Sequence, residues 1–167
     1  MNAPAIYNKE LTTAQTFGPA LFNEFVQWTD RSEKTARTYL VNLRQFWAFL
    51  LFAGVEQPQR ADVVNYRNWL LSEHDAIQLD PEAPQGWTYR TDRNGDRVQI
   101  TCKPNTARAY LRSVCQFFQW TASAGLYPNI AENIHAPKVR QDAHKKDALT
   151  AAEVLDVERS ILAAADK

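Results

Sequence analysis

The sequence predicts a mainly α-helical protein, a compact bundle of four to five helices with a β-hairpin inserted between two of them. Apolar residues recur at the spacing of an amphipathic helix in successive stretches of the chain. Only five of the 167 residues are glycine, which argues against a fold built from many tight β-turns. The pair Asn94-Gly95 lies between two short runs of β-forming residues, a pattern typical of a hairpin.

Three helices are expected in the first half of the chain, over residues 19–29, 32–54 and 60–73. Ser32 offers N-capping chemistry at the start of the second helix, and Gly54 is a natural stop at its end. The apolar set of the first helix is Leu21, Phe22, Phe25, Val26 and Trp28.

The second helix separates apolar from basic side chains. At about 100° per residue, one broad arc contains Tyr39, Leu40, Leu43, Phe46, Trp47, Leu50 and Leu51. Lys34, Arg37 and Arg44 fall together in a narrow arc beside it. We therefore expect an amphipathic helix with a basic flank.

The middle of the chain is predicted to contain a loop and the hairpin. Residues 75–86 are acidic and contain prolines, so they are expected to form a loop. Residues 87–91 and 97–102 are expected to pair as a two-stranded ribbon, which must lean on the helices or on a partner because an isolated ribbon is marginal. Whether Arg90, Arg93 and Arg97 of this ribbon reach nucleic acid or are simply exposed is left open.

A long helix is expected from Pro104 to about Gly125, followed by a short helical turn around residues 130–134. Its core face is predicted to contain Tyr110, Leu111, Val114, Cys115, Phe117 and Phe118. The opposite side groups Asn105, Arg108, Arg112, Gln116 and Gln119.

The ends of the chain are predicted to lie outside this bundle, which covers residues 19–135. Residues 1–18 are polar and mixed, as expected of a loose arm. Residues 136–148 indicate a basic linker. Residues 149–167 begin with a capping box, Thr150 and Glu153, and are expected to form the first helix of a truncated further domain.

The net charge is zero, with 19 basic and 19 acidic residues, so total charge does not indicate nucleic-acid binding. The distribution of charge is more informative. Residues 31–50, 103–112 and 135–146 each have a surplus of three positive charges, whereas residues 51–82 have a deficit of four. A neutral protein of this kind can still present one strongly positive face if its basic segments converge.

No pattern in the sequence predicts catalysis, a metal site or a cofactor. His74, His135 and His144 lie in no nucleophile or metal motif, and there is no glycine-rich phosphate loop. Cys102 and Cys115 have neither metal-ligand spacing nor a disulfide framework. Together with the lack of a secretory leader and of an apolar stretch long enough to cross a bilayer, this favours a cytoplasmic, intracellular protein.

Three stretches together resemble the N-terminal, SAM-like core-binding domain of tyrosine recombinases, the phage-integrase family. The first is Ser32–Leu50, and the second is Asn105–Trp120 followed by Gly125–Ile134. The third, Lys145–Val154, looks like the linker and first helix of that family's catalytic domain. The resemblance covers roughly residues 19–160 and rests on the order and spacing of these stretches.

The resemblance implies a helical domain that closes over one side of duplex DNA at a recombination site. By position, one DNA-facing helix would present Lys34, Thr35, Arg37 and Arg44, and the other Lys103, Asn105, Thr106, Arg108 and Arg112. Lys138, Arg140, Lys145 and Lys146 would follow the DNA backbone along the linker. Asn105 and Arg108 are the candidates for base readout, and Arg37 for phosphate contact.

The resemblance also implies that the parent enzyme breaks and rejoins DNA through a phosphotyrosine intermediate, without metal or nucleotide, as a tetramer on DNA. The family's catalytic residues belong to a domain that would begin near Ala148, so none can be transferred to this chain. We expect the fragment to bind double-stranded DNA as a monomer or weak oligomer, with no chemistry, small-molecule substrate or membrane partner. Its 75–102 insertion is longer than the family pattern.

Two other functions make different predictions from DNA binding. A helical protein-interaction module would have scattered basic residues and an exposed apolar groove. A small self-contained enzyme would need a polar pocket with perturbed titratable groups, and the sequence offers no candidate.

Overall fold

The computed structural model describes residues 19–138. The predicted N-terminal arm, residues 1–18, and the final predicted helix, residues 149–167, lie outside the described residues, as does most of the predicted linker. The chain divides into two units, Met1–Pro137 and Lys138–Lys167, and the boundary falls within the predicted linker.

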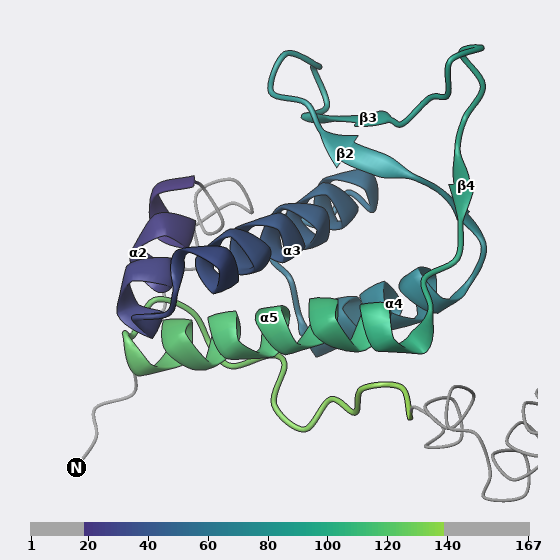
Figure 1. Cartoon of the computed structure of the whole chain (residues 1–167). Helices are drawn as coiled ribbons and strands as arrows, with labels where there is room; N and C mark the ends of the chain where they lie inside the picture. The colour runs from purple at the N-terminus through teal and green to yellow at the C-terminus, as the bar shows by residue number, and fades with distance from the viewer. Residues whose placement is uncertain (1–18, 139–167) are drawn as a thin grey trace, which may run out of the picture. The chain divides into compact units, whose positions relative to one another are not determined.

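The described part of the first unit is mainly helical (Figure 1). Its helices are α2 (Pro19–Thr29), α3 (Glu33–Phe52), α4 (Arg60–Leu71) and α5 (Pro104–Ser123). This confirms the predicted mainly α class and the position of each helix to within two residues. None of these helices is both long and apolar enough to cross a membrane.

Local signals explain where the helices begin and end. The Ser32 hydroxyl accepts a hydrogen bond from the Thr35 N–H (3.4 Å) and so caps α3. Gly54 follows α3 with φ +70°, a left-handed conformation that glycine adopts without a Cβ penalty. Pro104 occupies the first turn of α5, where its missing N–H costs nothing.

Aromatic rings from α2, α3, α4 and α5 fill the core. Phe25 and Phe117 are both fully buried, and their ring centroids lie 5.5 Å apart, edge to face. Phe46 contacts Tyr66 in the same way at 4.9 Å. The predicted core assignment of the aromatic residues is confirmed, but Trp28 was wrongly placed on the apolar side of the first helix, since it is 57% exposed.

The insertion contains four short strands: β1 (His74–Asp75), β2 (Ile77–Leu79), β3 (Trp87–Tyr89) and β4 (Gln99–Ile100). They form two antiparallel pairs, β1 with β4 and β2 with β3. The sequence-based pairing was therefore wrong in part. The predicted turn does form at its tip, where Thr91 bridges Arg97, but farther from the tip each arm of the ribbon pairs with the 74–79 segment that was expected to be loop.

Ala76 is the point at which the 74–79 segment changes partner. Its N–H donates to the Val98 carbonyl (2.7 Å), and its own carbonyl accepts from the Arg90 N–H (2.8 Å). Ala76 and Ile77 are 1% and 2% exposed. Burial of these apolar residues beneath the ribbon stabilises the ribbon, which would be marginal in isolation. Residues 74–79 therefore form strands and not the predicted loop.

The segment after α5 is held on α4 by two arginines. Arg60 donates hydrogen bonds to the carbonyls of Glu132 and Asn133. Arg67 donates to the His135 carbonyl (3.2 Å). The predicted helical turn at 130–134 is present as a turn over Ile130–Asn133. Both arginines come from the acidic segment of the chain and have a structural role.

Candidate nucleic-acid interface

Helices α3 and α5 meet along a polar seam. The Tyr39 hydroxyl donates to Gln116 Oε1 (2.7 Å). Farther along α3, Asn42 Nδ2 donates to Ser113 Oγ (2.8 Å) and more weakly to the Ala109 carbonyl (3.4 Å). As residue numbers increase along α3, the numbers of their partners on α5 decrease, so the two helices are antiparallel.

Exposed residues of both helices lie along the outer side of this seam. Asn42 and Ser113 are buried at 6% and 2% exposure, whereas Thr38 and Val41 on α3 and Ala109 on α5 are exposed. Lys34 lies one helical turn before Thr38, and Arg112 lies one turn before Gln116. We call this surface the α3–α5 face and define it by Lys34, Thr38, Val41, Asn105, Arg108 and Arg112, all of them exposed.

Three cations of this face have no carboxylate partner in the described part of the chain. Among the described residues, Lys34, Arg108 and Arg112 form no ion pair. The first turn of α5 also contains no acidic residue. Unpaired cations held in water are available to neutralise an anion without first breaking an internal contact.

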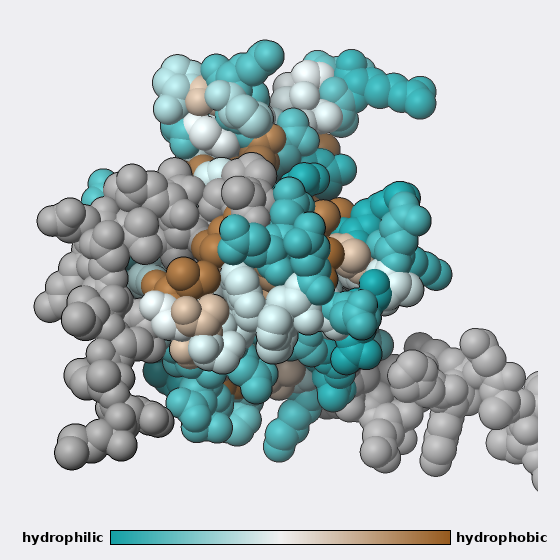
Figure 2. Space-filling model, turned by 90° about the vertical axis from the view of Figure 1, so that its left-hand side faces the viewer, coloured by the Kyte–Doolittle hydropathy of each residue, from teal (hydrophilic) through white to brown (hydrophobic). Residues whose placement is uncertain are grey.

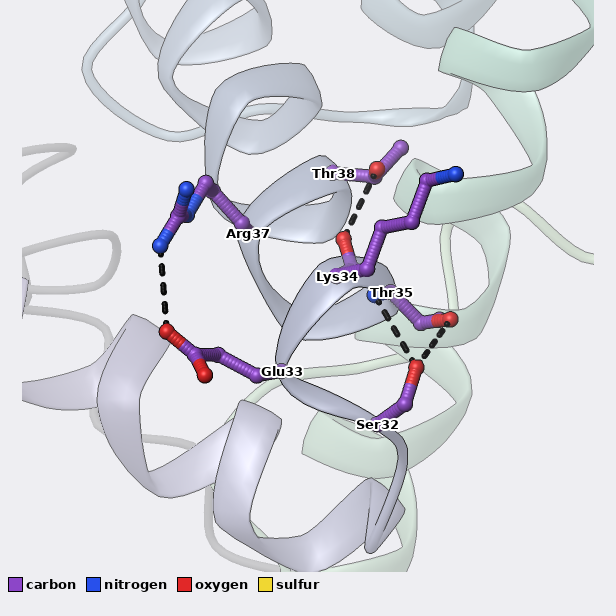
Figure 3. Close-up of polar contacts among 6 residues, drawn as sticks. All are labelled: Ser32, Glu33, Lys34, Thr35, Arg37 and Thr38. Atoms are coloured by element: carbon purple, nitrogen blue, oxygen red, sulfur yellow. Dashed lines mark hydrogen bonds and ion pairs between the residues drawn. The ribbon is translucent and has the colours of Figure 1, made fainter.

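The start of α3 differs from what the sequence suggested. Ser32 already accepts from the Thr35 N–H, and its hydroxyl also donates to Thr35 Oγ1 (3.1 Å). Arg37 forms an ion pair with Glu33 (3.0 Å), and Figure 3 shows it extending to the opposite side of α3 from Lys34. The Arg37 and Glu33 side chains are 76% and 88% exposed, so the pair contributes little and is easily exchanged for another anion.

The start of α5 is more open than that of α3. Lys103, Asn105 and Thr106 are exposed, and no side chain of the described region caps this end of the helix. Because α3 and α5 are antiparallel, this end lies away from the start of α3. Asn105 and Gln116 are separated by eleven residues, or about 16 Å along the axis. The two helix starts therefore lie at opposite ends of the α3–α5 face.

The remaining predicted contacts are dispersed. Arg44 follows Asn42 by two residues, or about 200° around the helix, and so points away from α5. Arg37 has the same relation to Tyr39. Lys138 is exposed but belongs to the second unit, and the linker residues Arg140, Lys145 and Lys146 lie outside the described residues.

The arginines of the insertion have separate roles. Arg97 pairs with Asp75 (3.4 Å) and lies over the Tyr89 ring, 3.8 Å from its centroid. Arg90 lies near Tyr110. Burial raises the pKa of Tyr110, and the positive charge of Arg90 offsets part of this increase. Arg93 is exposed at the tip beside Asn94. Only Arg93 of the three is placed to meet a partner without leaving a contact.

Sequence reasoning missed a hollow between the end of α2 and the second half of α5. It has a volume of about 270 Å³ and is lined by Trp28, Thr29, Arg31, Gln116 and Gln119. Figure 2 views the molecule from the side of α2 and shows hydrophilic, intermediate and hydrophobic residues interspersed on this side. The grouping of Gln116 and Gln119 with Arg112 on one helical side was the available sequence signal.

A second hollow, of about 310 Å³, lies between α3 and the loop joining β2 to β3. It is mainly apolar and lined by Trp47, Leu51, Leu79, Pro81, Ala83, Pro84, Gln85 and Gly86. An apolar hollow is the feature expected of a protein-interaction module.

Among residues 19–138, histidine, cysteine and tyrosine side chains meet at a small hollow. No three histidine, cysteine or acidic residues of this region could hold a metal ion together. A hollow of about 50 Å³ brings His74, Cys102 and Tyr110 near one another. Burial raises the pKa of Cys102, so its thiol is less readily ionised than a free cysteine.

No known family, curated protein or solved structure matches this chain.

Proposed function

We propose that this chain binds duplex DNA through the α3–α5 face and is the DNA-gripping part of a site-specific tyrosine recombinase. The observation that supports the proposal best is the α3–α5 seam. Lys34, Arg108 and Arg112 belong to the two antiparallel helices that meet at this seam, are exposed, and form no ion pair with any described residue.

The size of the face suits a duplex. Gln116 lies level with Tyr39, and Lys34 precedes Tyr39 by five residues, so the ends at Asn105 and Lys34 are separated by about 24 Å. Successive phosphates of one strand rise by about 3.4 Å, so the face covers roughly seven base pairs. Lys34 would contact a phosphate near one end and Arg112 a phosphate near the middle, whereas Arg108, toward the other end, stays a candidate for base readout. A helix of this diameter fits the major groove of B-form DNA.

The fold is compatible with this proposal at a coarse level. The two long helices are the ones for which the sequence resembles the SAM-like core-binding domain of integrases. In that family, breakage and rejoining of DNA belong to a separate domain. We therefore assign DNA binding, and no chemistry, to residues 19–135.

The proposal is tested by the salt dependence of binding. Fluorescence anisotropy with a labelled random-sequence duplex should show affinity falling steeply with salt, with a log–log slope of about −0.9 per phosphate neutralised. Arg112→Ala should weaken binding and flatten the slope by about one unit. No binding of the wild-type chain at low salt would refute the proposal.

Arg44→Ala is the matched control, because it removes the same charge from an exposed position on the side of α3 away from α5. It should leave the slope unchanged. Equal effects of Arg112→Ala and Arg44→Ala would mean that the protein binds DNA by general charge and not by the α3–α5 face.

A protein-interaction module is the second candidate, because the apolar hollow beside Trp47 and Leu51 could accept a side chain of a partner. This function predicts no salt-dependent DNA binding. Leu79→Asp, which would place a charge in the hollow, should abolish capture of the partner under this second function and leave DNA binding unchanged under the first.

A further inference from the structure

The described residues include three large hydrophobic side chains that are strongly exposed: Trp28, Val41 and Phe52. Two of them lie against other rings. Trp28 stacks on Phe25 with centroids 6.4 Å apart, and Phe52 meets Trp87 edge to face at 5.0 Å. Val41 is 53% exposed and lies on the α3–α5 face among polar and charged neighbours.

Val41 lies in a hollow of about 270 Å³ whose other lining residues are Lys34, Arg37, Thr38 and Asn42. The surface of this hollow is largely apolar, although most of its residues are polar. Lysine and arginine supply apolar stems there while their charged ends stay in water. The result is a small apolar recess bordered by two cations.

Neither helix formation nor core packing requires a valine at position 41. A β-branched residue in an exposed helical position has a slightly lower helix propensity than lysine, glutamine or alanine. Val41 is also not part of the buried core. What distinguishes the position is its place on the face that we propose to meet DNA.

Bases present one apolar group in the major groove of a duplex, the C5-methyl group of thymine. Lys34 borders the recess and belongs to the α3–α5 face, so a phosphate bound by Lys34 would bring base edges toward Val41. We propose that Val41 reads thymine in the target site by packing against its C5-methyl group. This inference rests on the proposed function and names a residue through which the α3–α5 face distinguishes sequences.

The test uses the full chain and replaces thymine with deoxyuridine, which removes only the methyl group. A preferred duplex is first selected from a random-sequence pool, and each of its thymines is then replaced in turn. For the wild-type chain, one replacement should weaken binding about fourfold, as expected for losing one buried methyl contact. Val41→Ala should bind the thymine and deoxyuridine duplexes equally.

Val41→Ile is the matched variant, because it keeps an apolar side chain in the recess and should keep the discrimination. Both variants should melt within a degree or two of wild type, because the position is exposed. Three results overturn the inference: selection enriches no thymine, no deoxyuridine replacement matters, or Val41→Ala discriminates as the wild type does. If the wild-type chain binds duplex DNA in these cases, the proposed function stands, whereas absence of all binding refutes both.

Discussion

Asn42 is the residue on which the geometry of the α3–α5 face depends most. It is 6% exposed, and its amide donates to Ser113 Oγ (2.8 Å) and to the Ala109 carbonyl (3.4 Å). A buried amide at a helix–helix contact is stable only while these partners are in place. Asn42→Ala removes both contacts and leaves the surrounding backbone intact.

The size of the effect follows from these contacts. Two hydrogen bonds contribute about 1 kcal/mol each, and the better helix propensity of alanine returns about 0.5 kcal/mol. Ser113 keeps one partner, since its hydroxyl also donates to the Ala109 carbonyl (3.3 Å). The expected loss is therefore about 1.5 kcal/mol, which lowers Tm by roughly 6 °C for a domain of this size.

The assay is thermal and urea unfolding followed by circular dichroism, on Asn42→Ala, Ser113→Ala and the double variant. Because the two side chains bond to each other, the double variant should lose about 1 kcal/mol less than the sum of the single losses. Strictly additive losses, or an Asn42→Ala protein as stable as wild type, would show that the Asn42–Ser113 bond does not hold the helices together.

Two further predictions concern stability. Tyr66 is fully buried with an unpartnered hydroxyl among the described residues, and burial raises its pKa well above 10.0. The neutral Tyr66 hydroxyl contributes its full stability below pH about 10. At higher pH only the unfolded chain ionises, so this contribution is lost. Tyr66→Phe should therefore reduce the fall in Tm between pH 9 and pH 11, and an unchanged fall would contradict this. Gly86→Ala should destabilise more than Gly95→Ala, as measured by Tm. Both glycines have positive φ, so either alanine variant should lose about 1–2 kcal/mol of stability through backbone strain. Of the two, only Gly86 has a neighbour that the added Cβ would meet, Leu51 Cδ1 at 3.1 Å. Equal losses would mean that Leu51 moves aside.

The helices of this protein could be predicted because their signals are local. Ser32, Gly54 and Pro104 act on the backbone within one turn of their own positions, so helix ends can be read without knowing the fold. The apolar periodicity of α5 likewise identified four of its buried residues, Leu111, Val114, Phe117 and Phe118. Helical spacing also groups the basic residues within α3 and within α5, and this grouping predicts a basic surface on each helix.

Side-chain environments at helix contacts could not be predicted in this way. The polar character of Asn42 and Ser113 predicts that they are exposed. They are buried because they form a hydrogen bond with each other across the seam. Trp28 follows the apolar spacing of α2 and yet is exposed, because α2 ends beside a hollow that Trp28 lines and no helix of residues 19–138 covers it there. Arg37 and Arg44 share an arc with Lys34, but only the packing of α5 shows that Lys34 lies on its side of α3.

The sequence by itself determined the helical class, the extent of the helices, the turn at Asn94-Gly95 and the three basic segments, since each depends on residues a few positions apart. Only the tertiary structure decided that β3 and β4 pair with residues 74–79 and that α3 and α5 are antiparallel. It also decided that Arg97 is held by Asp75 and Tyr89. These features join residues far apart in the chain, and their stability comes from burial and from hydrogen bonds that exist only after the helices have packed.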